Sequence, residues 1–235
     1  MYECDFKVQY VDIDSYGHLS EYGLLKYLQE IACLHADSRG FGLKDTENNR
    51  LAWIILNWQI DFISKPLWNT GIHIKTWASN IDNVSCYRDF EVTDDIGNKV
   101  AIASSKWVLV NIDTHHITKI TPEIKTAFEP IEPSVFNGEL AKLQEPENFD
   151  SCFDYTILRR DIDTNQHLNN LNYIMLAKEA LPEIMSFNHI EVLYKHQCIL
   201  GDKVVFLCKK ENNGYIIALK NEDKTVLHSI IKLEK

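Results

Sequence analysis

The sequence has no apolar run near the roughly 18 residues that a membrane-spanning helix requires, so we expect no membrane span. Its first residues, MYECDFKVQYVDID, lack the basic-then-apolar layout of a secretory signal peptide and the Arg/Ser bias of a transit peptide. The six cysteines are scattered and include no C-x-x-C pair. Cysteines of this kind are typical of reduced thiols, so we expect a cytoplasmic protein without a disulfide framework.

Basic charge is also scarce. The chain has 24 Lys and Arg against 34 Asp and Glu, a net charge of −10, which argues against a protein that binds nucleic acid. Residues 1–120 hold 11 basic and 16 acidic side chains, residues 121–150 hold 2 and 7, and residues 151–235 hold 11 of each. The acidity is therefore confined to the first half and the middle of the chain.

The composition is otherwise that of a globular protein, with 45% hydrophobic and 25% charged residues, and 235 residues suffice for two small domains. Four of the six prolines lie in the acidic, weakly periodic segment 121–150, where proline opposes both a helix and a central strand. We therefore predict an N-terminal domain at 1–120, a linker at 121–150 and a C-terminal domain at 151–235.

Both predicted domains show the same order of elements. A short strand leads into one helical pattern, at 19–40 in the first domain and at 168–182 in the second. Strand patterns follow in each domain, at 51–63, 71–81, 84–92 and 100–112, and then at 189–199, 203–210, 214–220 and 225–233. The pattern predicts an α+β fold of two tandem domains, each an antiparallel sheet wrapped around one long helix.

A repeated octapeptide marks the junction between the first strand and the helix of each domain. Asp12-Ile13-Asp14-x-x-x-His18-Leu19 and Asp161-Ile162-Asp163-x-x-x-His167-Leu168 share five of eight positions. Because the two copies occur at the same place in the element order, they indicate an internal duplication.

The second copy carries more polar residues than a helix end requires. Helix capping explains one or two of Asp163, Asn165, His167, Asn169 and Asn170, but not all five. His167 can relay a proton near neutral pH, and Asp163 can orient its imidazole. Asn165 and the N–H groups of the helix end can donate hydrogen bonds to a carbonyl that becomes an oxyanion. These are the groups that hydrolysis of an acyl group needs.

The segment RRDIDTNQHLNNLNY resembles the catalytic loop of the acyl-ACP thioesterases, which release fatty acids from acyl carrier protein (ACP) during fatty acid biosynthesis. LLKYLQEIACLHADSRG resembles the first helix of that family, ASSKWVLVNIDTHHITKITPEI the last strand of its first domain, and YKHQCILGDKV a second catalytic-region strand. The resemblance implies a double hotdog fold, a hydrolase that acts on fatty acyl-ACP, and ACP as the partner. It places the catalytic Asp, Asn and His of the family on Asp163, Asn165 and His167.

One position departs from the family. Where the family usually has Glu followed by Cys or another small residue, this chain has Gln197-Cys198, and Gln197 can hold a water molecule but cannot accept its proton. Two mechanisms stay open: His167 deprotonates a water held by Gln197, or Cys198 attacks the thioester with His167 and Asn165 as its partners. A buried cysteine on a strand is more often structural, which favours the water route.

The first copy of the repeat leaves a different enzyme open. YVDIDSYGHLSEY resembles the loop of single-hotdog acyl-CoA thioesterases, in which the second Asp, here Asp14, is catalytic. Since the first copy has Tyr16 where the second has Asn165, we interpret Asp14 as a helix cap and the first domain as the acyl-pocket side. An acyl-CoA thioesterase centred on Asp14 is one alternative, and a non-hydrolytic acyl-binding hotdog protein is another.

Further residues are expected to bind the substrate. Trp53 and Trp58 border an acyl tunnel, and Arg159 and Arg160 join a basic patch that attracts the acidic ACP. The other members of the predicted patch are Lys195, Lys209 and Lys210. We expect no metal, because His115-His116 and the group His196, Cys198 and Cys208 lack a full ligand set, and no cofactor, because no glycine-rich phosphate loop is present. The sequence neither requires nor excludes a homodimer.

Overall fold

The computed structural model describes residues 1–131, 133–136, 140 and 142–235, and the chain divides into two compact units, Met1–Leu140 and Ala141–Lys235. Each unit contains five antiparallel strands and one principal helix. Among the described residues, no helix is long and apolar enough to cross a membrane.

Unit 1 has the strand order β1-β3-β4-β5-β2, and every neighbouring pair is antiparallel. Its strands are β1 (Tyr2–Lys7), β2 (Leu51–Phe62), β3 (Gly71–Ile81), β4 (Ser85–Asp94) and β5 (Lys99–Asn111).

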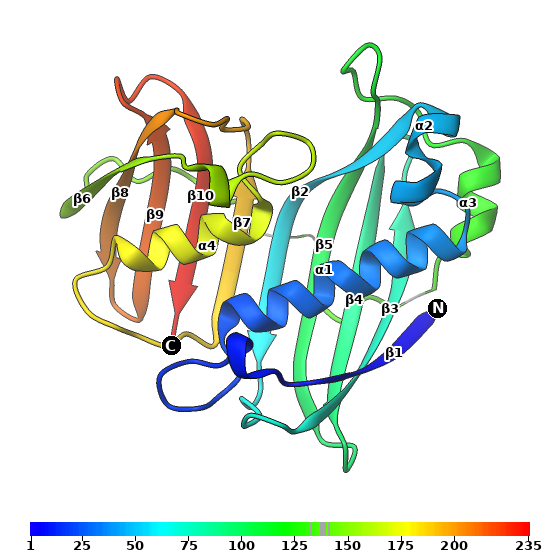
Figure 1. The fold of residues 1–235 in the computed structure, drawn as a ribbon, viewed down its shortest axis with the longest axis horizontal. Helices are drawn as coiled ribbons and strands as arrows, with labels where there is room; N and C mark the ends of the chain where they lie inside the picture. The colour runs from blue at the N-terminus through cyan, green and yellow to red at the C-terminus, as the bar shows by residue number, and fades with distance from the viewer. Residues whose placement is uncertain (132, 137–139, 141) are drawn as a thin grey trace. The chain divides into compact units, whose positions relative to one another are not determined.

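The principal helix of unit 1, α1 (Glu21–Ser38), runs across one face of this sheet (Figure 1). Leu24, Leu28 and Ile31 recur at helical spacing and are fully buried, so the apolar face of α1 covers the sheet. Ser20 precedes the helix and caps it, because its hydroxyl accepts the Gly23 N–H. The helix ends at Ser38, and Gly40, two residues later, adopts a φ of +77°.

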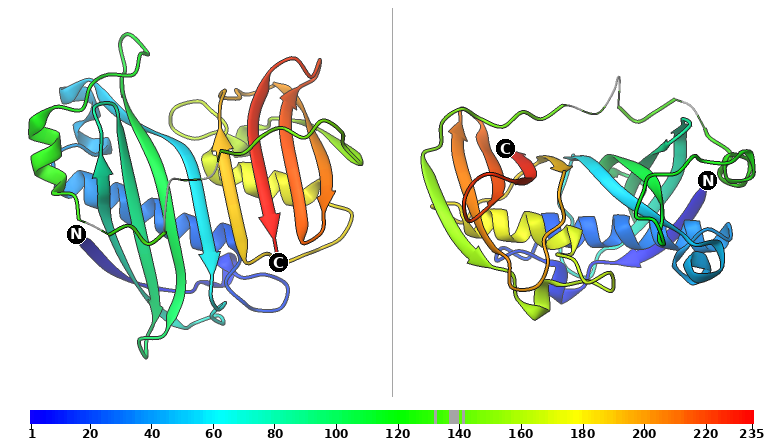
Figure 2. Two further views of the ribbon diagram at one scale, coloured as in Figure 1. Left: turned by 180° about the vertical axis from the view of Figure 1, so that it is seen from behind. Right: turned by 90° about the horizontal axis from the view of Figure 1, so that it is seen from above.

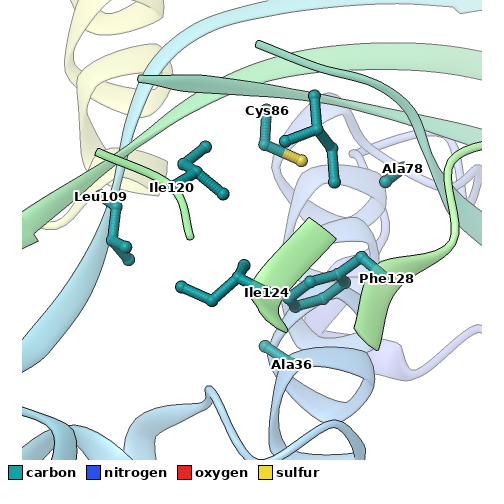
Figure 3. Packing of buried hydrophobic residues seen from close by; sticks show 8 residues of the cluster. Ala36, Ala78, Cys86, Leu109, Ile120, Ile124 and Phe128 are labelled. Atoms are coloured by element: carbon teal, nitrogen blue, oxygen red, sulfur yellow. The ribbon is translucent and has the colours of Figure 1, made fainter. Parts of the chain in front are cut away.

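A short helix lies where the prolines predicted none. α3 (Pro122–Phe128) starts with Pro122 in its first turn, where proline is tolerated because that N–H has no helical partner, and the Thr121 hydroxyl caps it. Ile124 and Phe128 of α3 enter a buried cluster with Ala36 of α1 (Figure 3). The expectation that 121–150 holds no helix is therefore wrong for this stretch. Residues 132, 137–139 and 141 of the predicted linker lie outside the described residues. A helical turn, α2 (Thr46–Asn49), precedes β2.

Unit 2 repeats the plan with the strand order β7-β10-β9-β8-β6 (Figure 2). Its strands are β6 (Ser151–Thr156), β7 (His189–Tyr194), β8 (Lys203–Glu211), β9 (Gly214–Asn221) and β10 (Leu227–Glu234), and its principal helix is α4 (Asn170–Glu179). α4 buries Leu171, Tyr173 and Ile174. The predicted α+β fold, with a hotdog arrangement in each half of the chain, is thus confirmed.

One predicted strand is too long. The pattern at 189–199 predicts a single strand, but β7 ends at Tyr194. The following residues leave the ladder because the Cys198 carbonyl accepts a hydrogen bond from the Leu168 N–H, 2.8 Å away, at the strand-to-helix junction. Gln197 and Cys198 therefore lie on a loop, not on a strand.

Candidate active site

The junction between β6 and α4 is a closed loop. After a 3₁₀ turn at Arg159–Asp161, the Asp163 N–H donates to the His167 carbonyl (2.8 Å) and the Gln166 N–H donates to the Asp163 carbonyl (3.1 Å). Ile162 then bridges Leu168, and Gln166 has a φ of +64°. The loop therefore reverses the chain within a few residues and presents its side chains at the start of α4.

Asp163 holds the main chain of this loop. Its Oδ1 accepts the backbone N–H of Asn165 (2.8 Å) and of His167 (3.3 Å). Among the described residues, no hydrogen bond joins this carboxylate to the His167 ring. Asp163 thus positions His167 through its backbone, whereas the sequence led us to expect contact with the imidazole.

A second carboxylate, that of Asp161, holds the start of the loop and was not among the site residues predicted from the sequence. Asp161 is 5% exposed, and its Oδ2 accepts the Tyr155 hydroxyl (2.9 Å) and the Leu158 N–H (2.8 Å). Its carbonyl accepts the Asn169 N–H (2.8 Å). Its place as the first Asp of the repeated octapeptide is a signal that could have identified it.

The His167 side chain is half-buried, and its Nδ1 is buried without a hydrogen-bond partner among the described residues. An unpaired buried polar atom is costly, so such an atom indicates a position where water or a ligand binds. The Asn165 side chain nearby in the chain is exposed. The loop therefore offers one group that can move a proton and one that can donate a hydrogen bond.

The loop after β7 lies against His167. Ile199 bridges His167, which brings Gln197 and Cys198 to the junction. Gln197 is exposed, whereas Cys198 is fully buried. Burial raises the pKa of the Cys198 thiol to about 12, although the Tyr173 hydroxyl partly opposes the shift. The thiol is therefore protonated at neutral pH and is a poor nucleophile.

Unit 1 contains the same loop at the junction of β1 and α1. The Asp14 N–H donates to the His18 carbonyl (2.7 Å), and Asp14 Oδ1 accepts the N–H of Tyr16 (2.9 Å) and of His18 (3.0 Å). Ser20, not Asp14, caps α1, so the interpretation of Asp14 as a helix cap is wrong. Asp14 performs the same backbone task as Asp163.

The duplication extends to a second segment that the sequence did not reveal. The Leu19 N–H donates to the Pro66 carbonyl (2.7 Å) and His18 bridges Leu67, which reproduces the contacts of Cys198 and Ile199. Lys65 therefore stands where unit 2 has Gln197, and its Nζ lies 2.7 Å from a Glu21 carboxylate oxygen. Unit 1 therefore has the same loop backbone as unit 2, but it has Tyr16 and Lys65 in place of Asn165 and Gln197.

Two sequence profiles of one protein family together match most of the chain. The sequence profile of the acyl-ACP thioesterase N-terminal domain matches residues 1–128, and that of the C-terminal domain matches residues 144–234. The chain belongs to the acyl-ACP thioesterase family.

Two plant proteins are similar to the chain in sequence, and two solved structures are similar to it in fold. Oleoyl-acyl carrier protein thioesterase 1 from Arabidopsis thaliana is 29% identical over 86% of this chain, and thioesterase 2 is 30% identical over 81%. The chain spans 62% and 58% of the length of these two relatives. An acyl-ACP thioesterase from Bacteroides thetaiotaomicron superposes with a TM-score of 0.89 at 22% identity, over 99% of this chain and 96% of that one. The 12:0-ACP thioesterase from Umbellularia californica gives 0.87 at 21% identity, over 99% and 96%.

The two tryptophans predicted to border an acyl tunnel lie on one face of the unit 1 sheet. Residues five apart on a regular strand point to opposite faces of the sheet. A bulge in β2 between Ile55 and Asn57 shifts this alternation by one residue, so Trp53 and Trp58 both lie on the face that carries Trp107. Trp58 is 1% exposed and packs on Phe90 and Trp107, and the indole N–H of both predicted tryptophans is buried without a partner among the described residues.

The predicted basic patch is smaller than expected. Arg159 and Arg160 are exposed at the start of the loop, and Lys195 is exposed just after β7. β6 enters the loop at Thr156, which pairs with Lys203 at the start of β8. Lys209 and Lys210 lie at the other end of β8, away from the loop. Including Lys209 and Lys210 was therefore wrong, and Asp150 binds the Lys209 ammonium there (3.5 Å).

A His–Glu–Glu group in unit 2 was missed by sequence reasoning. Ligand atoms of His189, Glu191 and Glu234 lie within 4.8 Å of one another. Lys232 Nζ is 2.7 Å from Glu234 and 3.5 Å from Glu191, so an ammonium already occupies the position where a cation would bind. Burial acts to raise the pKa of Glu191, but His189 and Lys232 outweigh it and the pKa is lowered.

Proposed function

We propose that this protein hydrolyses the thioester of fatty acyl-ACP and releases a free fatty acid and ACP. The observation that carries the proposal is the unpartnered buried Nδ1 of His167, in a loop whose backbone is held by two aspartates and whose neighbours are Asn165 and Gln197. Membership of the acyl-ACP thioesterase family supports the substrate class.

In the proposed reaction, Gln197 holds a water molecule by hydrogen bonds and His167 accepts its proton as the water oxygen attacks the thioester carbon. Asn165 and backbone N–H groups at the first turn of α4 stabilise the tetrahedral oxyanion. The intermediate then collapses, and the leaving thiolate takes the proton from His167. Asp163 and Asp161 hold the loop in place throughout.

The burial of Cys198 supports water over a covalent acyl-enzyme. A nucleophilic cysteine needs a lowered pKa and access to its substrate, and Cys198 has a raised pKa and no exposed surface. Its carbonyl contact with Leu168 gives it a structural role instead.

The test is a panel of acyl-ACP and acyl-CoA substrates of increasing chain length, with release of free fatty acid as the readout. We expect turnover of acyl-ACP, and loss of turnover in His167→Ala but not in Asp14→Asn. The opposite response of these two variants would instead establish the acyl-CoA thioesterase centred on Asp14. Acyl binding without release at any chain length would establish a non-hydrolytic acyl-binding protein and refute the proposal.

We also propose ACP as the partner and the cytoplasm as the compartment. The free thiols of all six cysteines support a reducing compartment.

A further inference from the structure

Two tyrosines of unit 2, which the proposed reaction does not use, lie where the loop after β7 meets α4. Tyr173, in the first turn of α4, is 3% exposed, and Tyr194, the last residue of β7, is half-buried. Their rings pack edge to face, with 5.1 Å between the centroids and 82° between the planes. Each side chain carries a hydroxyl group that contacts another segment of the candidate site.

Each hydroxyl joins the loop after β7 to α4. Tyr194 lies three residues before Gln197, and its hydroxyl donates to the carbonyl of Asn170, the first residue of α4 (2.9 Å). The Tyr173 hydroxyl forms hydrogen bonds with the thiol and with the backbone of Cys198, the residue after Gln197. Contacts with the first turn of α4 therefore flank Gln197 on both sides along the chain.

Unit 1 has the same backbone arrangement at its own junction. In both units, two successive N–H groups that follow the strand donate to one carbonyl of the neighbouring strand: those of Ile63 and Ser64 to Val100, and those of Lys195 and His196 to His228. This register places Phe62 of β2 at the position of Tyr194. Counting from the repeated octapeptide places Leu24 of α1 at the position of Tyr173.

The loop backbone of unit 1 forms without either hydroxyl. Leu24 and Phe62 carry none, yet the Leu19 N–H still donates to the Pro66 carbonyl (2.7 Å). A buried hydroxyl costs free energy unless it is paired, so the backbone alone favours apolar side chains at these two positions. The two hydroxyls occur in the unit that also carries the candidate reacting groups, which indicates a role in the site.

We propose that Tyr173 and Tyr194 are positioning residues for the hydrolysis: their hydroxyls hold the loop at Gln197 in place relative to His167. This inference rests on the proposed thioesterase function. In that reaction Gln197 holds the attacking water, and a displacement of about 1 Å can lower the rate of a reaction step by about 100-fold. The rate of the chemical step, and not the affinity for acyl-ACP, should therefore depend on the two hydroxyls.

The two hydroxyls keep these contacts over the pH range of an assay. Burial raises the pKa of Tyr173 and of Tyr194 well above the usual value of about 10, so both groups stay protonated. Loss of either hydroxyl should therefore lower kcat without changing the shape of its pH profile. A residue that transferred the reacting proton would change that shape.

The test measures kcat and KM for acyl-ACP in Tyr173→Phe and Tyr194→Phe, each of which keeps the ring and removes the hydroxyl. We expect kcat to fall by about tenfold or more in each variant, while KM stays within about threefold of the parent. In a Gln197→Met background, Tyr173→Phe should lower kcat by less than about twofold more, because the water has already lost its position. Since unit 1 has Phe62 at the position of Tyr194, Tyr194→Phe is the second variant if Tyr173→Phe does not fold.

Tyr27→Phe is the matched control in unit 1. Tyr27 is also 3% exposed, and its hydroxyl donates to the Lys7 carbonyl (3.0 Å) and to the carboxylate of Asp12, the first Asp of that octapeptide. Loss of this hydroxyl should lower the melting temperature but leave kcat within about twofold of the parent, since the unit 1 loop takes no part in the proposed reaction.

The outcomes separate this inference from the proposed function. If kcat stays within about twofold of the parent in both tyrosine variants while His167→Ala is inactive, the proposed function stands and the positioning role is overturned. An equal loss of kcat in Tyr27→Phe would overturn it too, because reduced stability would then be the cause. So would a changed pH profile, or a full loss from Tyr173→Phe in the Gln197→Met background. A parent protein that releases no free fatty acid would refute the proposed function and this inference with it.

Discussion

At the scale of single residues, the two candidate reacting groups have opposite surroundings. His167 is half-buried with an unpaired ring nitrogen, whereas Cys198 is fully buried with a pKa of about 12. We expect His167→Ala and Asn165→Ala to lower kcat/KM for acyl-ACP by at least about 100-fold, the usual range for lost acid–base or oxyanion groups. Cys198→Ala should stay within about fivefold, because thiolate chemistry is not required.

The same three variants distinguish the covalent route. Mass spectrometry of the enzyme, quenched during turnover, should show no acyl group on Cys198. An acyl adduct on that residue, together with an inactive Cys198→Ala variant that melts like the parent, would show that the cysteine is the nucleophile.

Gln197 allows a sharper test of how the water is held. Gln197→Met has a similar size but cannot form hydrogen bonds, and we expect it to lower kcat by about tenfold or more, since the water loses its position. Gln197→Glu restores a group that can accept a proton, and its kcat should depend on pH through a new acidic limb. Identical pH profiles for Gln197→Glu and the parent would show that position 197 does not face the reacting water.

His35 makes the stability of the chain sensitive to acid. Its pKa is about 3 in the folded protein against 6.5 in the unfolded chain, so between these values only the unfolded state binds the proton. Its contribution is complete above pH 6.5 and is lost as the pH falls, by about 2 kcal/mol at pH 5. Urea unfolding at pH 7 and pH 5 should show a smaller loss of unfolding free energy for His35→Gln than for the parent. Equal losses in the two proteins would contradict the burial of a neutral imidazole.

At the scale of elements, the two copies of the loop differ at one strained position. Gly17 has a φ of +85° and Gln166 has a φ of +64°, a region that side chains other than glycine rarely adopt. Gly17→Ala should destabilise the protein by about 1 kcal/mol through strain alone, because a Cβ there meets no atom within 4 Å.

Gln166→Gly is the matched change in the other copy and should stabilise by up to about 1 kcal/mol. Thermal unfolding of both variants measures the difference. Shifts of the same sign in the two variants would mean that the copies are not strained alike.

The sequence predicted the helices and strands whose positions depend on residues close together in the chain. The apolar spacing of α1, the stop at Gly40 and the alternation in the β strands each depend on neighbours in sequence. The contacts of Asp163 with backbone amides, and the pairing of Cys198 with Leu168, depend on main-chain groups that leave no side-chain signature. For the same reason the equivalence of Lys65 and Gln197 became visible only from the structure.

The prolines of 121–150 show the limit of a composition argument. Proline opposes a helix interior but not a first turn, and α3 uses Pro122 in its first turn. Its burial of Ile124 and Phe128 depends on partners such as Cys86 and Leu109, which lie far away in sequence. Thr121 and Pro122 are a local start signal for α3, but the burial of the helix depends on these distant partners.

At the scale of the whole molecule, the net charge of −10 would repel ACP, the acidic partner that we propose, unless basic side chains gather beside the candidate site. Unit 2 presents Arg159 and Arg160 at the entrance to the candidate active loop, with Lys195 exposed on the loop after β7. At physiological salt, charges interact over about 8 Å, so we expect these cations to act on the proposed partner more strongly than the distant acidic surface does, even with Asp161 Oδ1 lying 3.8 Å from Arg160 Nε.

Reversing this charge is the direct test of ACP attraction. Arg159→Glu/Arg160→Glu should lower kcat/KM for acyl-ACP by about tenfold or more at low salt and flatten its salt dependence, because steering acts mainly on association. Hydrolysis of a short uncharged acyl thioester should change little, since neither arginine belongs to the proposed reacting groups. Lys209→Glu/Lys210→Glu, at the far end of β8, is the matched control and should leave the acyl-ACP reaction nearly unchanged. Equal effects of the two double variants would mean that net charge, and not its position beside the loop, governs the encounter.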